Sequence, residues 1–536
     1  HAMLAKLNFE RSAMIVLSFL FFISMHNQII RKVASFTLPS VSRSPLRSSQ
    51  LHSSNPFSSL LGDMAKSFRS GSNHAPLNQQ IDAKLQSVVD SWHDIRNTLQ
   101  NQQTLEERSF RDNLPKGYGR GSPLHKVRLF DESNKEEDIR VTFYRDSASW
   151  CPYCQKVWLT LEEKRIPYRV EKVNMSCYGD KPSSFLQIQP GGQIPVANID
   201  GRIYGQSNDI IFALEDEFPD YKSLRPSDGS LAQQLLRLER GIFSAWMSWL
   251  TGSARNRAYF FNTLQEVEDA LVASNGSFFM GSKVSMVDIQ FAPFLERMAA
   301  SLLYFKGFML RVPKGVPTKY PAINSWFDAM EELESYQLTK SDYYTHCWDL
   351  PPQLGGCTSE PDGEPYRKAI NGHRRLDGSC GSWTLPLECH NGGVEPDWDW
   401  AADAANREAA ERISGNAEAI VAFACRGAGQ KGFPSYRAPL ADPKAVPNTA
   451  VSQGVEACLQ VICKALLEGT ESHMSSMAAV VKIIREDGGA DYAVGVANSL
   501  SYLRDRVGVP RDMRLPAARA LRAHLNWAVD SIMNQA

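Results

Sequence analysis

The stretch IRVTFYRDSASWCPYCQKVWLTLEEK, residues 139–164, contains the features that decide the fold. Ile139 to Tyr144 has the residues of a β-strand, and Cys154 to Lys164 has the spacing of an α-helix. The run Trp150-Cys151-Pro152-Tyr153-Cys154 lies directly between them. The sequence therefore predicts a pair of cysteines at the point where a strand leads into a helix.

Cys151 is predicted to lie in the first turn of that helix. Backbone amides lack partners there and the helix dipole is positive at this end, so a sulfur in this place is stabilised as the reactive thiolate. Cys154 follows one helical turn later, where it can form an internal disulfide with Cys151. The alternative is a pair of buried, unreactive thiols at a helix end, because the chain has ten cysteines.

Length and composition limit the classes of protein. A chain of 536 residues has room for about two to four domains. The formal net charge is -1, which argues against a nucleic-acid partner, because no overall positive field would attract a polyanion. Ten cysteines in so long a chain are too sparse for a disulfide scaffold, so a reducing compartment in which thiols can cycle fits best.

The beginning of the chain is interpreted as a targeting presequence. The apolar run Ala13 to Met25 follows basic residues and has the length of a signal-peptide core, with a transmembrane anchor as the alternative. Ala34-Ser35-Phe36 then opens a stretch to Ser72 that is rich in Ser, Arg and Pro, the composition of a transit peptide. The two in series resemble the bipartite presequences of algae whose plastids lie inside extra membranes, so plastid localisation is expected.

A helix with one apolar face is predicted after the presequence. Its apolar residues recur at alternating steps of four and three: Ile81, Leu85, Val88, Trp92, Ile95 and Leu99. This stripe packs either against the body of the protein itself or against a partner, as a short coiled-coil seam. The segment from Pro115 to Pro123 contains three glycines and predicts a linker.

The rest of the chain changes character several times. Ile139 to Asp220 predicts strand, helix, strand, helix, strand, strand and helix, which gives a mixed sheet with helices on its faces. Leu231 to Tyr336 is helical throughout. Cys347 to Trp400 has no sustained period, and its tryptophans favour a strap over another surface rather than a free linker. Helical spacing returns in Ala401–Ile413, Val455–Leu467, Met477–Arg485, Tyr492–Val507 and Pro516–Ile532.

From about Ile139 to Tyr344 the sequence resembles a glutathione transferase of the cysteine-containing type, similar to the omega, lambda and dehydroascorbate-reductase classes. Those classes have a cysteine where this sequence has Cys151, and the CPYC context also resembles glutaredoxins. Most other transferase classes have Ser or Tyr there. The resemblance implies thiol exchange, because a cysteine sulfur is both a good nucleophile and a good leaving group.

The resemblance extends to residues that would hold glutathione. Gly192-Gln193-Ile194-Pro195 matches the turn with a cis proline, where Ile194 and Pro195 would present main-chain groups of Ile194 to the cysteinyl part of the ligand. Gln206-Ser207 opens a helix and corresponds to the pair that binds the γ-glutamyl end, although the cysteine classes usually have Glu in place of Gln206. The alternative for Ser207 is a simple N-cap.

Lys181 falls where the omega-type classes have a lysine that reaches the glycine carboxylate of glutathione. The alternative is an ordinary surface lysine. The helical half is expected to supply the pocket for the second substrate. Its candidate wall residues, which are also typical of a helical core, are Trp246, Trp249, Tyr259 and Phe260.

The expected fold is an α/β thioredoxin-like domain followed by an all-α glutathione-transferase C-terminal domain, with an extra all-α module at the end. The expected parts are a targeting presequence (1–80), an amphipathic helix and linker (81–135), the glutathione-binding domain (136–225), the helical transferase domain (226–345), the strap or linker (346–400) and the helical C-terminal module (401–536). The part that ends at Tyr344 is expected to fold without the rest, provided that the strap does not cover an apolar face.

The resemblance implies a glutathione-dependent thiol transferase or reductase. Cys151 would attack a mixed disulfide or a small oxidised substrate and become glutathionylated; a second glutathione or Cys154 would then release it. One alternative is a non-catalytic binding or assembly module in the plastid, because so much of the chain lies outside the resemblance. Another is a disulfide-exchange enzyme that does not need glutathione.

The expected partners are glutathione, as co-substrate, and a small-molecule or protein thiol or disulfide. A protein partner would bind through the N-terminal helix or the C-terminal module, and no nucleic acid is expected. No metal is expected either. The cysteines and histidines that could suggest zinc lack the short paired spacing of such sites: His346, Cys347, Cys357, Cys380, Cys389 and His390.

Overall fold

The computed structural model describes residues 76–373, 381–387, 394–395 and 402–534. Nearly all of the predicted presequence lies outside these residues, and so do Cys380, Cys389, Trp398 and Trp400. The prediction of a presequence therefore stays a prediction.

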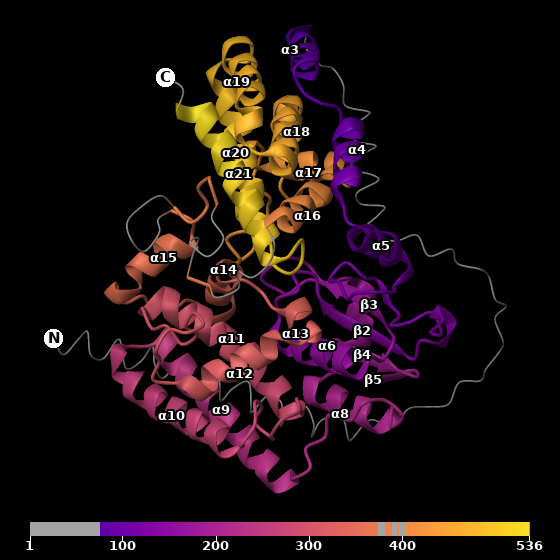
Figure 1. Ribbon diagram of the computed structural model, residues 1–536, viewed down its shortest axis with the longest axis vertical. Helices are drawn as coiled ribbons and strands as arrows, with labels where there is room; N and C mark the ends of the chain where they lie inside the picture. Colours follow the sequence, from indigo (N-terminus) through magenta and orange to yellow (C-terminus); the bar gives the residue numbers. More distant parts are fainter. Residues whose placement is uncertain (1–75, 374–380, 388–393, 396–401, 535–536) are drawn as a thin grey trace, which may run out of the picture. The chain divides into compact units, whose positions relative to one another are not determined.

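A five-stranded mixed sheet carries the cysteine pair (Figure 1). Its strands are β1 (Val127–Arg128), β2 (Val141–Asp146), β3 (Tyr168–Val173), β4 (Val196–Ile199) and β5 (Arg202–Tyr204). They lie in the order β1-β3-β2-β4-β5, with β2 and β3 parallel and the other pairs antiparallel. The predicted mixed sheet is confirmed. Strand β1 is additional, because two residues are too short for a sequence pattern to reveal.

Helices lie on both faces of this sheet, which makes the domain thioredoxin-like. Helices α6 (Pro152–Lys164) and α8 (Ser207–Glu217) contact each other, and α6 also contacts the helical domain. The short helix α7 (Ser183–Ile188) has its own cluster, in which Phe185 packs with Val173 and Val196. The predicted order of strands and helices from Ile139 to Asp220 is confirmed.

The helical transferase domain is built around one buried helix, α11 (Met286–Lys306), whose residues are all buried. A capping box fixes its start: the Ser285 side chain accepts from the first turn, and Asp288 accepts the Ser285 amide at 2.9 Å. Around it lie α9 (Gly229–Thr251), α10 (Arg257–Ala273), α12 (Pro321–Glu331) and α13 (Glu334–Thr339).

Two further helices pack on α11 where a strap was expected. They are α14 (Tyr343–Leu354) and α15 (Glu364–Ile370). Helix α14 crosses the predicted domain boundary at residue 345, so the helical domain continues beyond it. Pro351 and Pro352 lie inside α14 and hide its helical period in the sequence. The remaining described part does cover a surface, since Trp383 is buried against Tyr344 with ring centroids 4.9 Å apart.

The regular elements of the C-terminal module are all helices, as expected, and a loop with one isolated bridge between Gln430 and Val446 precedes α18. It contains α16 (Ala402–Ser414), α17 (Ala417–Ala424), α18 (Ser452–Glu468), α19 (Met474–Lys482), α20 (Gly489–Arg506) and α21 (Leu515–Asn534). Only α17 is missing from the predicted set of helices. Thr449–Glu468 is long and apolar enough to cross a membrane, but 72% of its apolar window is buried in the module, as in a core helix of a globular protein.

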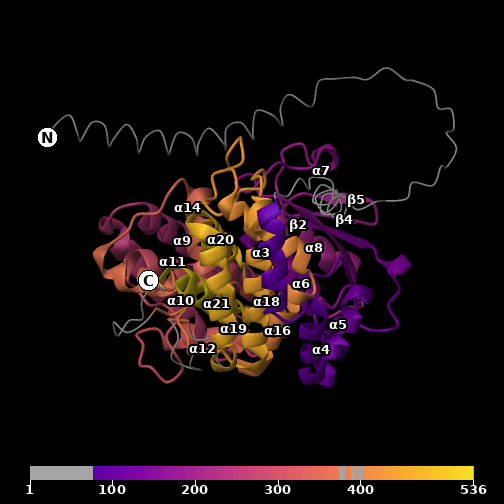
Figure 2. The same ribbon diagram turned by 90° about the horizontal axis from the view of Figure 1, so that it is seen from above.

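The apolar stripe near the start of the described chain belongs to two helices rather than one. Helix α3 (Pro76–Ser87) ends before Ser91, whose side chain caps α4 (Trp92–Gln102) by accepting the Asp94 amide at 3.2 Å. Both helices lie beside α18, and Ile81, Leu85 and Ile95 join the core of the C-terminal module (Figures 1 and 2). The stripe is therefore used inside this chain and is not available as a seam for a partner. Helix α5 (Leu105–Asn113) follows.

The C-terminal module is joined to the transferase domain by buried polar contacts. Arg522 of α21 donates to Asp342, the N-cap of α14, at 2.6 Å, and both side chains are 1% exposed. Tyr344 donates to the main-chain oxygen of Asp505 at 3.2 Å. A chain that ends at Tyr344 would cut α14 and remove the buried cation of Asp342, which argues against independent folding of that part. The expectation that it folds alone stays a prediction.

Candidate active site

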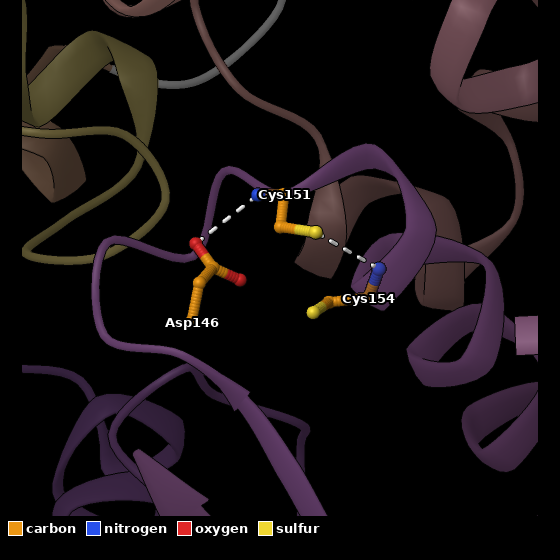
Figure 3. A group of neighbouring side chains, drawn as sticks. All are labelled: Asp146, Cys151 and Cys154. Carbon is orange, nitrogen blue, oxygen red and sulfur yellow. Dashed lines mark hydrogen bonds between the residues drawn. The ribbon is translucent and has the colours of Figure 1, made fainter. Parts of the chain in front are cut away.

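Cys151 is the N-cap of α6, directly after the turn that follows β2. Its sulfur accepts a hydrogen bond from the Cys154 amide, with a distance of 3.4 Å between sulfur and nitrogen (Figure 3). Pro152 occupies the first helical position, where its missing amide hydrogen costs nothing. The predicted placement of the cysteine pair at a strand-to-helix junction is thus what the structure has. A negative sulfur in this position faces the positive end of the helix.

A carboxylate completes the group. Asp146, the last residue of β2, accepts the amides of Trp150 (2.5 Å) and Cys151 (3.1 Å) through Oδ2. One of its oxygens and the two sulfurs lie within 4.8 Å of one another, and all three residues are buried. Figure 3 shows the carboxylate and both sulfurs directed toward the same space. The sequence argument missed Asp146; an acid at the end of the strand before the motif was the available signal.

Side chains of the helical domain hold Trp150 through a chain of hydrogen bonds, the brace, which runs from Trp150 to His346 to Glu296. Its indole nitrogen donates to Nδ1 of His346 at 2.9 Å, and Nε2 of His346 lies 2.7 Å from Glu296. An indole N–H can only donate, so Nδ1 must accept and the ring proton must be on Nε2, directed at Glu296. Burial, together with the charge of Arg297, lowers the pKa of His346 and keeps it neutral. The guanidinium of Arg297 also donates to the main-chain oxygen of Trp150.

Glu296 anchors this brace as a buried carboxylate. It accepts from His346, from the Ser341 amide at 3.0 Å and from Gln155 Nε2 at 2.9 Å. Burial opposes ionisation of Glu296, but the hydrogen bond from His346 and the charge of Arg297 outweigh it and lower its pKa to about 2. The cysteine turn is therefore held from the side of α11 and α14. Nothing local to the motif in the sequence points to these residues.

The predicted glutathione ligands lie on three separate segments. The peptide bond between Ile194 and Pro195 is cis, as the resemblance implies. Lys181 lies against the same turn, because a Cβ at Gly192 would be 3.0 Å from its Cδ. The ammonium of Lys181 donates to the main-chain oxygen of Asn174 at 2.6 Å, and burial lowers its pKa while the charges of Cys154 and Cys151 oppose this.

Gln206 and Ser207 are at the start of α8. The N-cap is Gln206, whose side chain makes no capping hydrogen bond, and Ser207 is the first helical residue. The alternative of Ser207 as a simple N-cap is therefore wrong. Ser207 is buried and Gln206 is exposed. The first amides of an eleven-residue helix are thus left without a side-chain cap, as in sites that bind carboxylates.

The expected wall residues are mostly core. Trp246, Trp249 and Phe260 are at most 1% exposed, and Tyr259, which is half exposed, is the exception. The side chains that face the cysteine helix come from an earlier turn of α9 and from α11. They form a cluster around the half-exposed Tyr153: Arg240, Phe243 and Phe294. Burial raises the pKa of Tyr153, and Arg240 opposes this shift.

Metal ligands gather differently from the pattern considered in the sequence. His346 is bound to Trp150 and Glu296, and the thiol of Cys347 donates to the main-chain oxygen of Ala300 at 3.5 Å. Within the described ranges, three ligating atoms come together only at Asp146, Cys151 and Cys154. The expectation that no metal is required stays a prediction.

A thioredoxin-like domain with a cysteine at the start of its first long helix, followed by a helical domain around a buried capped helix, defines a transferase of the cysteine-containing kind. The sequence comparisons agree. A family model described as "Glutathione S-transferase, N-terminal domain" matches residues 150–217, and one described as "Glutathione S-transferase, C-terminal domain" matches residues 251–329.

Individual relatives match the same region. Glutathione S-transferase DHAR2 of Arabidopsis thaliana is 30% identical over 194 residues, which cover 36% of this chain and 84% of the relative. Glutathione S-transferase DHAR3, chloroplastic, of the same species is 30% identical over 198 residues, covering 36% and 69%. The crystal structure of Chlamydomonas reinhardtii dehydroascorbate reductase is 25% identical and covers 38% of this chain and 94% of that one, with a TM-score of 0.33. The chain belongs to the glutathione S-transferase family.

Proposed function

We propose that the protein is a glutathione-dependent thiol transferase or reductase with Cys151 as its nucleophile. The observation that carries the proposal is the position of the Cys151 sulfur, which caps α6 and accepts the Cys154 amide. Thiol exchange needs a sulfur that can both attack a disulfide and leave from one. A cysteine at this place supports such exchange better than activation of glutathione for attack on an electrophile.

In the proposed reaction, the Cys151 thiolate attacks the glutathione sulfur of a mixed disulfide R–S–S–G. A Cys151–glutathione disulfide forms and R–S⁻ leaves. A second glutathione then attacks this disulfide, so that oxidised glutathione leaves and the Cys151 thiolate is regenerated. Small oxidised substrates such as dehydroascorbate are the second proposed substrate class, and the similar Chlamydomonas reinhardtii structure is that of a dehydroascorbate reductase. With a mixed disulfide, one glutathione thiol is consumed, because the other sulfur of the oxidised glutathione comes from the substrate. With dehydroascorbate, two glutathione thiols supply the two electrons.

The glutathione site proposed here uses the three segments around the cysteine turn. Lys181 pairs with the glycine carboxylate, and the main chain of Ile194 before Pro195 pairs with the cysteinyl part. Gln206 and Ser207, with the uncapped start of α8, bind the γ-glutamyl carboxylate. The aromatic cluster around Tyr153 is the proposed wall for the second substrate.

The test is a turnover assay with glutathione and either dehydroascorbate or a glutathionylated peptide. Cys151→Ser should abolish turnover of both, whereas Cys154→Ser should retain part of it. Cys458→Ser is the matched control, because Cys458 is a buried free cysteine in the C-terminal module. Activity that survives the change at Cys151 would sink the mechanism.

The second candidate is a non-catalytic binding or assembly module of the same fold. The low exposure of the cysteines favours it, since Cys151 is 7% and Cys154 1% exposed. The large module 402–534, which joins α3 and α4 in one core, also lies outside the matched family domains. Retention on glutathione resin without turnover of either substrate would favour this candidate. A disulfide-exchange enzyme that does not need glutathione would instead catalyse exchange without being retained on the resin.

Plastid localisation is a further part of the proposal. It rests on the signal-like and transit-like composition of residues 1–80 and on a relative whose name includes the word chloroplastic. Fusion of residues 1–80 to a fluorescent protein tests it, and cytosolic fluorescence of the fusion would contradict it.

A further inference from the structure

Asp146 is placed to take part in the chemistry of the second cysteine. One of its carboxylate oxygens lies within 4.8 Å of both sulfurs, and these are within the same distance of each other. Asp146 and Cys154 are each 1% exposed, so water has little access to the space between them. A proton that leaves Cys154 therefore needs an acceptor inside the protein.

The backbone contacts of Asp146 do not account for a carboxylate. Both of its side-chain hydrogen bonds, from the Trp150 and Cys151 amides, end on Oδ2, and no group in the described part of the chain donates to Oδ1. An uncharged amide oxygen would accept the same two bonds. A buried charge is costly. Among the described residues, the charges of Arg145, Lys181 and Arg297 interact with Asp146. Oδ1 therefore remains available to accept a proton from a neighbour.

Cys154 needs a group that accepts its proton. Burial raises the pKa of its thiol well above the ordinary value, and the neighbouring Cys151 raises it further. Cys154 is therefore a protonated thiol near neutral pH, and a protonated thiol is a poor nucleophile. It can attack a disulfide on Cys151 only if the proton is removed during the attack.

We propose that Asp146 is a catalytic residue that accepts the Cys154 proton and so enables a dithiol route. This inference rests on the proposed function, because it begins from Cys151 joined to glutathione. The Cys154 sulfur attacks the Cys151 sulfur, its proton moves to Asp146, and the bond between Cys151 and glutathione breaks. Glutathione leaves as a thiolate, the two cysteines form a disulfide, and Asp146 returns its proton to the leaving thiolate. Cys154 is oxidised and the glutathione sulfur is reduced.

Other charged groups interact with this centre, and their protonation can also contribute to a pH profile. They are Arg145 on β2, Lys172 on β3, Lys181 before α7, Arg297 on α11 and Asp349 on α14. Crowding by neighbouring atoms and the charge of Arg145 lower the pKa of Lys172 to about 8, although its side chain is exposed, and Lys172 is therefore left unchanged in every variant. Burial raises the pKa of Asp349 well above its ordinary value.

The experiment follows Cys151 in the full-length protein after mixing with glutathione disulfide. Acid-quenched samples are analysed by mass spectrometry for two products, the Cys151–glutathione adduct and the Cys151–Cys154 disulfide. The variants are Asp146→Asn, which keeps an oxygen for the two amides, and Cys154→Ser, which removes the resolving thiol. Asp349→Asn is the matched control, because it changes another buried carboxyl near Asp146, one whose pKa burial raises well above its ordinary value.

In Asp146→Asn, the adduct should form and its resolution should slow by about 100-fold at neutral pH, the usual size of a general-base effect. Its resolution rate should then rise about tenfold per pH unit, whereas the wild-type rate should change little between about pH 6 and pH 8. Resolution in Asp146→Asn at the wild-type rate would overturn the inference alone. The wild-type pH profile decides even if the variant fails to fold, since a tenfold rise per unit in wild type also overturns it. Absence of any adduct at Cys151 would overturn the proposed function as well.

Discussion

The substitution His346→Leu tests whether the brace on Trp150 holds the reactive turn. The histidine accepts the Trp150 indole and donates to Glu296, and both neighbours are buried. Leucine fills a similar volume but can do neither. The indole N–H then has no acceptor, and the Glu296 carboxylate keeps only its bonds from Ser341 and Gln155.

The expected loss of unfolding free energy follows from these two bonds. A buried donor without a partner costs about 1–3 kcal/mol, and loss of a hydrogen bond to a charged group costs about 1.5–3 kcal/mol. The sum is about 2.5–6 kcal/mol, and the gain from the apolar leucine reduces it slightly. Cys151 should become alkylated at a different rate, because Trp150 and Cys151 share the acceptor Asp146.

The dependence of the unfolding free energy on pH provides a second test of the role of His346. Burial places the pKa of folded His346 below its unfolded value of about 6.5, so below this pH the unfolded state binds a proton that the folded state does not. Wild type therefore loses about 1.4 kcal/mol per pH unit below about pH 6.5, and a leucine at this position does not. The difference in unfolding free energy between wild type and His346→Leu should therefore become smaller as the pH falls toward 5.

Urea unfolding at pH 7.5 and 5.5 measures the free energies, and peptide-level mass spectrometry measures alkylation of Cys151. The matched control is His524→Leu in α21, another buried histidine whose pKa is lowered by burial. The control should lose stability and show the same narrowing with pH, but its Cys151 should react as in wild type. Equal alkylation of Cys151 in His346→Leu and wild type would refute the idea that the brace positions the sulfur.

Two further substitutions test the ligand site and the joint between the domains. Lys181→Met should raise the KM for glutathione about tenfold with little change in kcat, as expected for one lost charge-assisted contact, whereas the exposed Lys482→Met should leave both unchanged. An unchanged KM would remove Lys181 from the site. Arg522→Met leaves Asp342 buried without its cation and should cost about 3–5 kcal/mol in urea unfolding; the double change with Asp342→Leu should recover most of this. A loss below about 1 kcal/mol would show that the pair does not hold the two parts together.

The predictable part of the fold is the part with local signals. The alternation of strands and helices around Trp150-Cys151-Pro152-Tyr153-Cys154 predicted the sheet, because each element has its own period and turn residues. Helix α14 was hidden because two prolines near its end break the pattern, although they fall in a helix whose N-cap is Asp342. The break between α3 and α4 was missed for the opposite reason, since the apolar spacing continues across Ser91.

The residues of the candidate site can also be divided into those with a local sequence signal and those without one. Cys151, Cys154, Ile194-Pro195 and the start of α8 could be predicted because each has a motif with a defined place in the chain. His346 and Glu296 could not, since a buried histidine and a buried glutamate in separate helices acquire their roles only when the helices pack. Long-range polar pairs of this kind have no period and no local spacing.

The C-terminal module belongs to the active site more closely than its position in the sequence suggests. It contacts α14, which carries His346, through the buried pair of Arg522 and Asp342. It also contacts the loop before Lys181, where the Ala438 amide donates to the main-chain oxygen of Cys177 at 3.1 Å. Segments on both sides of the cysteine turn thus contact residues of the C-terminal module, and Ala438 itself packs in the core of the transferase domain. Because those contacts join elements on either side of Cys151, we expect a change in how the module docks to alter both α14 and the loop before Lys181, and labelling of Cys151 in a variant of either contact would measure this.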